Sequence, residues 1–438
     1  MNYRQARDYI EKGTGKILPG LSRIEALMEE LGHPEREVPC IHIAGTNGKG
    51  SILAYISTTL THAGYKVGRY VSPTLYSYRE RFQINGCPIS RERFTELAEE
   101  VAGAVDRLEA RGISRPSAFE LETALGFLYF QQEACDWLVL ECGMGGKEDA
   151  TNVIPAPKLA VFASISMDHM KFLGNSLREI ASAKAGIIKE GCQVVTCRQP
   201  EEVMEVLEEE ASRHQARLIL ADAGEALCQE NSLEGQRFLY KGASLSIQLT
   251  GSCQKENVIT AYEALKALQR EGLSLTDHKI REGLAQTVWK GRFTCIGKHP
   301  YFFVDGAHNP AAARKLRESI ETYFPQKRKI FINGVFADKD YEEIIRITAP
   351  LADQIFTIAT PGSSRALPAQ ELARAIARVN PHVQACAGLE EAVERAYEAA
   401  GDQDVILAFG SLAFIGELSK DVTNYREKMR GNDQFRSE

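Results

Sequence analysis

Short runs of consecutive apolar residues, separated by longer amphipathic stretches, constrain the fold of this 438-residue chain more than any other feature. A strand with one solvent-facing side alternates apolar and polar residues, whereas a strand covered on both faces is apolar throughout. The longer stretches, such as 91–112, repeat their apolar residues every three or four positions and predict helices. Together these patterns predict an α/β fold with mostly parallel sheets. The expected strands include residues 40–45, 137–143, 159–166, 192–197, 217–221, 301–307, 329–336, 353–359 and 404–411.

The length of the chain predicts more than one domain. A helical stretch ends in WKGRF (289–293), and a new strand–loop–helix unit follows it at 295–310. We therefore expect an N-terminal α/β domain with a mostly parallel sheet over residues 1–294. A smaller Rossmann-like α/β domain is expected over residues 295–438.

Charge and composition exclude several classes of partner. The 52 basic and 59 acidic residues give a net charge of −7, which argues against nucleic-acid binding through a basic face. No apolar run reaches the roughly 18 residues that a membrane span needs, and the N-terminus is polar, so no membrane partner and a cytoplasmic location are expected. The ten cysteines form no CxxC pair, so structural zinc is not expected.

A glycine-rich turn, GTNGKGS (45–51), joins an expected strand to a helix predicted to begin near Ser51. Backbone N–H groups in such a turn face one concavity, and the helix N-terminus favours an anion there. Lys49 can reach the terminal phosphates of a nucleotide, and Ser51 can lie near a metal ion. In the usual P-loop the hydroxyl residue follows the lysine directly, whereas here Gly50 intervenes. The alternative interpretation is an ordinary strand–helix turn with an unrelated lysine.

Polar residues also follow two other expected strands. Glu141 ends one strand and Asp168-His169 follows another, so both lie where parallel strands place a ligand crevice. A carboxylate there suits a hard metal ion. The alternatives are a solvated glutamate at a strand end and a structural histidine. Lys184 lies on an expected helix, where its simplest interpretation is a solvated lysine.

The loop DGAHNP (305–310) follows the first long strand of the expected second domain. Polar groups on a strand-to-helix turn suit a ribose, a phosphate or an amino acid. Asn309 before Pro310 also predicts a helix cap. The two roles are compatible, because one loop can serve both.

With these segments in order, the chain resembles the folylpolyglutamate synthase/dihydrofolate synthase family of the Mur ligase superfamily. The resemblance runs from about residue 15 to residue 420. Its motifs are HIAGTNGKGS, SPTLYSYRERFQING, FELETALGF, ECGMGGKEDATNVI, MDHMKFLGNSLREIASAKAGIIK, WKGRF, DGAHNPAA, GVFADKDY, SRALPAQEL and GSLAFIGEL.

The resemblance implies a ligase that joins L-glutamate to a folate or to dihydropteroate, through an acyl-phosphate intermediate formed with ATP. It implies a P-loop-type ATPase domain of the Mur ligase central type over residues 1–294 and a Mur ligase-type glutamate-binding domain over residues 295–438. It also implies two Mg²⁺ sites, small-molecule partners and a monomer. The implied ATP contacts are Gly48, Lys49, Gly50, Ser51, Asn257, Arg292 and Asp305. The implied metal ligands are Ser72, Glu141, His169 and a carbamylated Lys184. The implied pterin contacts are Phe119, Glu120 and Thr123. The implied catalytic residues are Lys49, Lys184 and His308.

The chain departs from the family pattern mainly near the acceptor. Thr74 stands where the family usually has histidine, and Lys147-Glu148 replace an Arg-Leu pair. A point charge thereby replaces a bidentate donor. We therefore expect tetrahydrofolate as acceptor, with dihydropteroate as a second one. The alternatives are a Mur-type ligase with another carboxylate acceptor and a non-catalytic nucleotide-binding protein.

Overall fold

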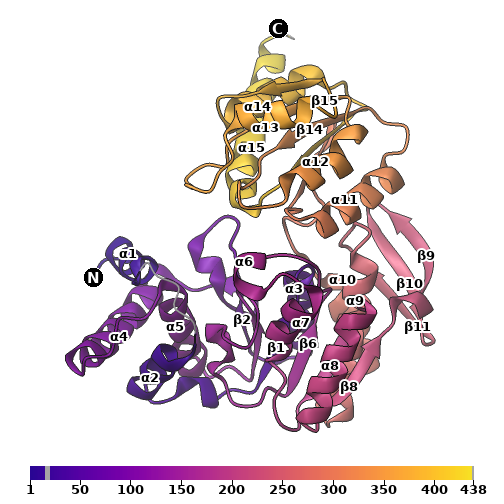
Figure 1. Cartoon of the computed structure of the whole chain (residues 1–438). Coiled ribbons are helices and arrows are strands. Elements are labelled where there is room, and N and C mark those ends of the chain that lie inside the picture. The colour runs from indigo at the N-terminus through magenta and orange to yellow at the C-terminus, as the bar shows by residue number, and fades with distance from the viewer. Residues whose placement is uncertain (15–19, 437–438) are drawn as a thin grey trace.

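The computed structural model describes residues 1–14 and 20–436, arranged around three sheets (Figure 1). The largest sheet has the strand order β4-β3-β2-β5-β1-β6-β7-β8. The strands from β2 to β8 in this order are parallel, whereas β3 and β4 extend one edge in antiparallel fashion. Its strands are β1 (Cys40–Ala44), β2 (Val67–Tyr70), β3 (Phe82–Ile84), β4 (Cys87–Pro88), β5 (Trp137–Glu141), β6 (Leu159–Phe162), β7 (Gln193–Cys197) and β8 (Arg217–Ala221).

The other two sheets follow in the chain. A three-stranded antiparallel sheet contains β9 (Leu227–Ser232), β10 (Gly235–Tyr240) and β11 (Ala243–Ile247). A six-stranded sheet has the order β12-β13-β17-β14-β15-β16 and is parallel except for β12. Its strands are β12 (Thr294–Gly297), β13 (Tyr301–Asp305), β14 (Lys329–Asn333), β15 (Gln354–Thr357), β16 (Val383–Ala385) and β17 (Val405–Phe409).

The predicted α/β fold with a mostly parallel sheet is confirmed, but the strand ends differ from the prediction. Each of β1, β5 and β6 ends one to four residues before its predicted end. The reason is that the residues beyond these strands leave the sheet and form the loops at its carboxyl edge. The prediction also missed β9 to β11, whose residues alternate between buried and exposed positions or are largely exposed.

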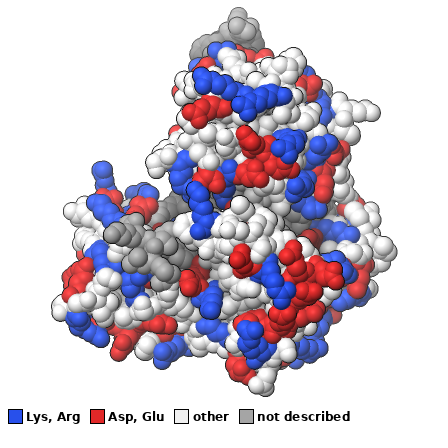
Figure 2. All heavy atoms as spheres, in the orientation of Figure 1, with Lys and Arg blue, Asp and Glu red and all other residues white. Residues whose placement is uncertain are grey.

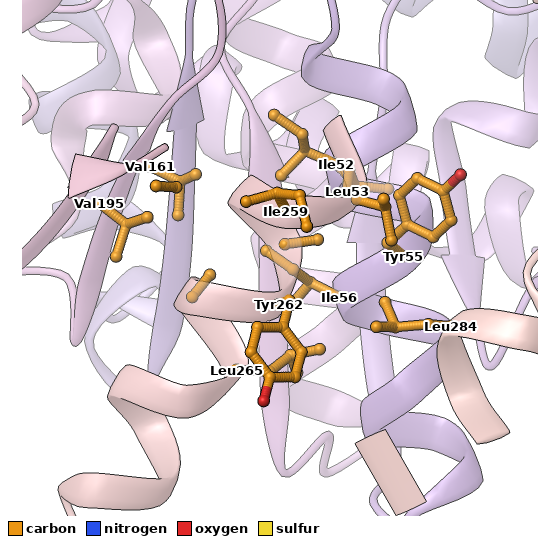
Figure 3. Packing of buried hydrophobic residues seen from close by; sticks show 14 of the residues in the cluster. Ile52, Leu53, Tyr55, Ile56, Val161, Val195, Ile259, Tyr262, Leu265 and Leu284 are labelled. Carbon is orange, nitrogen blue, oxygen red and sulfur yellow. The ribbon is translucent and has the colours of Figure 1, made fainter. Parts of the chain in front are cut away.

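Helix α3 (Lys49–His62) is surrounded by apolar side chains and forms the centre of the largest core cluster. Figure 3 shows its residues Ile52, Leu53 and Ile56 beside Ile259 of helix α9 (Gln254–Arg270) and Leu284 of helix α10 (Asp277–Gln286). A helix that is apolar all round is stable only when it is buried. This packing fixes the N-terminus of α3, which carries the glycine-rich turn. The helix begins at Lys49, two residues before its predicted start.

The remaining helices cover the two larger sheets. Figure 1 shows the C-terminal part (residues 294–436) above the N-terminal part (residues up to 293). The helices of the N-terminal part, besides α3, are α1 (Tyr3–Lys12), α2 (Ser22–Glu30), α4 (Arg91–Ala110), α5 (Ala118–Gln132), α6 (Met170–Leu173), α7 (Leu177–Ala185), α8 (Glu201–Arg213), α9 (Gln254–Arg270) and α10 (Asp277–Gln286). Those of the C-terminal part are α11 (Pro310–Tyr323), α12 (Tyr341–Thr348), α13 (Ala369–Ala377), α14 (Leu389–Ala399) and α15 (Ile415–Arg436).

The surface carries charges of both signs. On the face shown in Figure 2, basic and acidic side chains are interspersed, and no continuous basic band crosses the molecule. Within the described residues, none of the helices combines the length and the apolar character that crossing a membrane would require.

Candidate active site

A cavity of about 260 Å³ lies where the two parts meet, at the carboxyl ends of β1, β5, β6 and β13. The structure brings twelve of the fifteen predicted site residues to its walls. They are Gly48, Lys49, Gly50, Ser51, Ser72, Glu141, His169, Lys184, Asn257, Arg292, Asp305 and His308.

The glycine-rich turn is shaped by its neighbours. Gly48 has a φ of +97°, and a Cβ at this position would lie 2.4 Å from Oδ1 of Asn257 on α9. Gly50, which separates the lysine from the hydroxyl residue, packs against the indole of Trp289. Ser51 is buried and accepts a hydrogen bond from Nε2 of Gln254 at 3.4 Å. Side chains at these two glycines would therefore press against Asn257 and Trp289.

Lys49 and Glu141 face each other across the floor of the cavity. Nζ of Lys49 donates to the carbonyls of Gly45 and Thr46 and lies 3.9 Å from Oε1 of Glu141. The Glu141 residue is only 5% exposed, so the interpretation as a solvated strand end is wrong. Burial raises the pKa of its carboxyl, and the charges of Lys49 and Arg292 oppose that shift. The 3.9 Å separation from Lys49 is longer than a hydrogen bond, so this buried carboxylate remains available as a ligand for a metal ion.

Lys184 is buried, and the interpretation as a solvated helical lysine is also wrong. Its Nζ donates to the carbonyl of Gly45 at 2.9 Å, so α7 delivers it to the back of the glycine-rich turn. Burial, reinforced by repulsion from Lys49, lowers the pKa of the Lys184 amine to about 7. A substantial fraction of this amine is therefore neutral near physiological pH.

A polar network joins the two parts beside the cavity. The Asp168 carboxylate accepts from Nζ of Lys339 at 2.6 Å and from Nδ2 of Asn309 at 3.1 Å, and Nε2 of His308 lies 3.5 Å from it. Although burial opposes ionisation, the hydrogen bond from His308 and the charge of Lys339 hold the pKa of Asp168 well below its usual range. Next to it, the His169 side chain is 38% exposed and lies 3.9 Å from Asp168, and partial desolvation lowers the pKa of its imidazole to about 4.

The loop after β13 is held by its own carboxylate. Asp305 accepts from the backbone N–H groups of Phe293 at 2.7 Å and Ala307 at 2.8 Å. Burial raises the pKa of Asp305, and the guanidinium of Arg292 opposes that shift. Asn309 caps α11 by accepting from the N–H of Ala312 at 2.9 Å, which confirms the predicted cap.

The three predicted pterin contacts do not line this cavity. The ring of Phe119 packs against Gly143, where a Cβ would lie 2.5 Å from its Cζ atom. The Glu120 carboxylate caps α5 by accepting from the N–H of Ser117 and forms a buried ion pair with Arg23. Thr123 donates to the carbonyl of Phe119. The capping role of Glu120 could have been predicted, because SAFE (117–120) has the spacing of a capping box.

Three further residues at this junction, Asn47, Lys339 and Leu75, were not predicted from the sequence. Asn47 and Asn309 pair through their amides at 3.0 and 3.2 Å, although they are 262 positions apart. Lys339 comes from the GVFADKDY motif, but nothing local indicates its partner. Leu75 packs into a core cluster of the C-terminal part, close to Gly291. The tertiary structure alone brings these residues to the site.

Comparison with known proteins assigns the chain to a family. Residues 43–265 match the Mur ligase middle domain, and residues 291–412 match the Mur ligase glutamate ligase domain. The chain is 35% identical to the dihydrofolate synthase/folylpolyglutamate synthase of Bacillus subtilis over 428 residues, which cover 95% of this chain and 98% of that protein. It belongs to this family of Mur ligases.

Other members of the dihydrofolate synthase/folylpolyglutamate synthase family share the fold over nearly the whole chain. A structure of the Mycobacterium tuberculosis folylpolyglutamate synthase complexed with ADP and AMPPCP has a TM-score of 0.86 and 31% identity, and covers 94% of this chain and 96% of that one. A structure of E. coli FolC in complex with DHPP and ADP has a TM-score of 0.85 and 27% identity, and covers 97% and 99%. The resemblance that the sequence motifs indicated is thereby confirmed.

Proposed function

We propose that this protein joins L-glutamate to a reduced folate, and also to dihydropteroate, at the expense of ATP. The observation that carries the proposal is that the glycine-rich turn, the buried Glu141 and the Arg292–Asp305 loop line one cavity between the two parts. A ligase needs a nucleotide, an acceptor carboxylate and an amine in one place, and the groups proposed to bind them line this one cavity. The family relatives and their nucleotide complexes support ATP as the substrate.

The residues present fit a magnesium ion. In the described part of the chain, no group of three or more His, Cys, Asp and Glu side chains is arranged to hold a metal. Mg²⁺ does not need such a group, because it is usually held by one or two carboxylates together with substrate phosphates and water. Glu141 and Ser72 would supply oxygen ligands, and His169 and a carbamylated Lys184 would serve a second ion. When bound, the ions would neutralise charge on the transferring phosphoryl group.

The chain's own residues then have separate tasks. Lys49 would contact the terminal phosphate, and Asn257 and Arg292 would hold the remainder of the nucleotide. The acceptor carboxylate would be activated as an acyl phosphate, and the amine of glutamate would attack it near His308. Carbamylation of Lys184 requires the neutral amine, which adds to carbon dioxide and loses a proton to water. The lowered pKa of Lys184 supports this step.

We take residues 1–294 and 295–438 as the two domains, with the WKGRF segment as hinge. The glycine-rich turn lies before this boundary, whereas Asp305 and His308 lie after it. Catalysis therefore requires the two domains to close. The Asn47–Asn309 amide pair supports a closed arrangement. Small-angle scattering should show compaction when an ATP analogue and an acceptor are added, and unchanged dimensions would contradict the hinge. We also propose that the chain acts as a monomer.

Product analysis tests the proposed function. Purified protein is given ATP, Mg²⁺ and L-glutamate with either tetrahydrofolate or dihydropteroate, and the products are measured by mass spectrometry. We expect a glutamyl adduct of tetrahydrofolate with one ADP released per bond. The Lys49→Ala variant should keep its fold and lose most turnover. If neither acceptor is consumed while ATP binds normally, the chain acts on a different carboxylate.

A further inference from the structure

A second hollow, of about 320 Å³, lies where α1, the loop after β2 and the start of α4 meet. We call it the basic hollow, because every charged side chain on its walls is an arginine. Aromatic rings form much of the remaining wall. The side chains used below are Arg7, Arg79, Arg91, Tyr3, Tyr76 and Tyr78.

Two of the three guanidinium groups are not balanced by a carboxylate. Arg7 forms a two-point ion pair with Glu11, at 2.8 and 3.0 Å. Arg79 donates to the carbonyl of Ile89, and the guanidinium of Arg91 lies over the ring of Tyr3 at 5.5 Å. Among the residues that the structure describes, neither Arg79 nor Arg91 forms an ion pair. The basic hollow therefore has a net positive charge and favours an anionic ligand.

The loop that forms one wall is held in place. Both oxygens of Glu80 are used by backbone N–H groups of Leu75, Tyr76 and Ser77, at 3.0 to 3.3 Å. The nearest acid in the sequence is thus turned to its own loop and does not neutralise Arg79. Because this loop is already ordered, a ligand that binds to its donors does not have to order the loop first.

The basic hollow adjoins the catalytic cavity along the same loop. Pro73 lines the cavity, and the next residue, Thr74, lines the basic hollow. Consecutive Cα atoms are about 3.8 Å apart, so the two spaces lie on neighbouring residues of one loop, and an extended acceptor that passes Pro73 would next meet Thr74 at the edge of the hollow. The ligand of the hollow is therefore expected to be continuous with the acceptor.

We propose that the basic hollow binds the tail of an acceptor that already carries several glutamyl residues. This inference rests on the proposed function. Each added glutamyl residue brings one more carboxylate, and a planar guanidinium pairs with a carboxylate through two hydrogen bonds. The tyrosine rings pack against the methylene groups between the carboxylates. The arginines thus favour long acceptors over dihydropteroate, which carries no glutamate.

The test compares acceptors of different length in charge-neutralised variants. KM is measured for dihydropteroate and for tetrahydrofolate triglutamate in the Arg79→Gln and Arg91→Gln variants. In each variant we expect the ratio of the triglutamate KM to the dihydropteroate KM to rise about fivefold. A loss of affinity of this size is typical when one charged contact is removed. The rise should shrink at high salt, because the pairing is electrostatic. Arg4→Gln is the matched control, since Arg4 is exposed on α1 and does not line the hollow.

Direct binding provides the second measurement. Tri-γ-glutamate without a pterin should bind the wild type in a calorimetric titration. It should bind a variant that combines Arg79→Gln and Arg91→Gln at least about fivefold more weakly. Thermal unfolding checks that the variants are folded. An unchanged KM ratio in both variants, with normal addition of glutamate to tetrahydrofolate, overturns the tail site and leaves the proposed function intact. Failure of the wild type to use any folate acceptor overturns both.

Discussion

The Nζ atom of Lys339 lies 2.6 Å from Oδ1 of Asp168, and both side chains are less than a tenth exposed. Lys339 belongs to the C-terminal part and Asp168 to the loop after β6, 171 positions earlier. The same carboxylate also accepts from Asn309. One acidic group of the N-terminal part therefore holds two elements of the C-terminal part over the cavity.

The Lys339→Met variant should lower kcat/KM for glutamate. Removing one partner of a buried ion pair leaves the other charge uncompensated, which costs about 3–5 kcal/mol. We expect about half of that free energy to be lost from the closed, catalytic arrangement. A loss of about 1.4–2.8 kcal/mol lowers kcat/KM about tenfold to a hundredfold. Steady-state kinetics and thermal unfolding measure the two effects.

The control for this variant is a second ion pair in the same loop. Arg365 pairs with Asp338 at 2.6 Å, but both side chains are well exposed. Arg365→Gln should change stability by less than about 1 kcal/mol. Equal kinetics in the Lys339→Met variant and this control would show that the Asp168–Lys339 pair has no part in closure.

Gly48→Ala tests the shape of the glycine-rich turn. The new Cβ would lie 2.4 Å from Oδ1 of Asn257, so the amide must move away from the position proposed for its contact with the nucleotide. A displacement of this size should reduce ATP-dependent turnover by about tenfold or more. Gly64→Ala is the matched control, because Gly64 has a similar φ of +102° and no atom near the new Cβ. Both variants should lose about 1–2 kcal/mol of stability, but only Gly48→Ala should lose turnover.

Glu141→Gln tests the magnesium site. The amide keeps the shape of the side chain but removes the charge, so the Mg²⁺ concentration for half-maximal rate should rise about 10–100-fold. Burial raises the pKa of Glu141. Ionisation of this carboxyl therefore destabilises the folded state at every pH above the pKa that the group has in the unfolded chain. The variant should therefore unfold at a higher temperature at pH 7 without Mg²⁺. Glu148→Gln, on an exposed side chain of the same loop, should change neither property.

Lys184→Met should abolish turnover and stabilise the fold. The amine has a pKa of about 7 when folded and about 10.4 when unfolded. Below pH 7 both states bind the proton, and the folded state bears the full cost of a buried charge. Between these two pKa values the unfolded state alone is protonated, so the cost declines as the pH rises.

The gain from Lys184→Met should therefore be largest at pH 6–7, about 1–4 kcal/mol, and small near pH 10. The carbonyl of Gly45 keeps a donor, because Lys49 also donates to it. Denaturant unfolding at several pH values measures the gain. The exposed Lys158→Met is the control, and a gain that does not depend on pH would contradict the assigned titration.

Local sequence patterns predicted much of this site. Unbroken apolar runs predicted the buried parallel strands, because a strand covered on both faces has no place for a polar residue. The glycine-rich turn between such a strand and a helix predicted the phosphate loop, and the position of Glu141 at a strand end predicted its place in the crevice. Asn257 and Arg292 came only from the resemblance to the family, since no local pattern marks them.

The sequence by itself thus determined the fold class, the phosphate loop and the carboxyl edge on which the site is built, because periodicity and chain order are local properties. Tertiary structure alone decided which polar groups are buried and which partners they meet. Lys184 has the sequence environment of a solvated lysine, yet the packing of α7 against the turn buries it. Lys339 meets Asp168 across 171 positions because the N-terminal and C-terminal parts meet beside the cavity, and no local pattern encodes that contact.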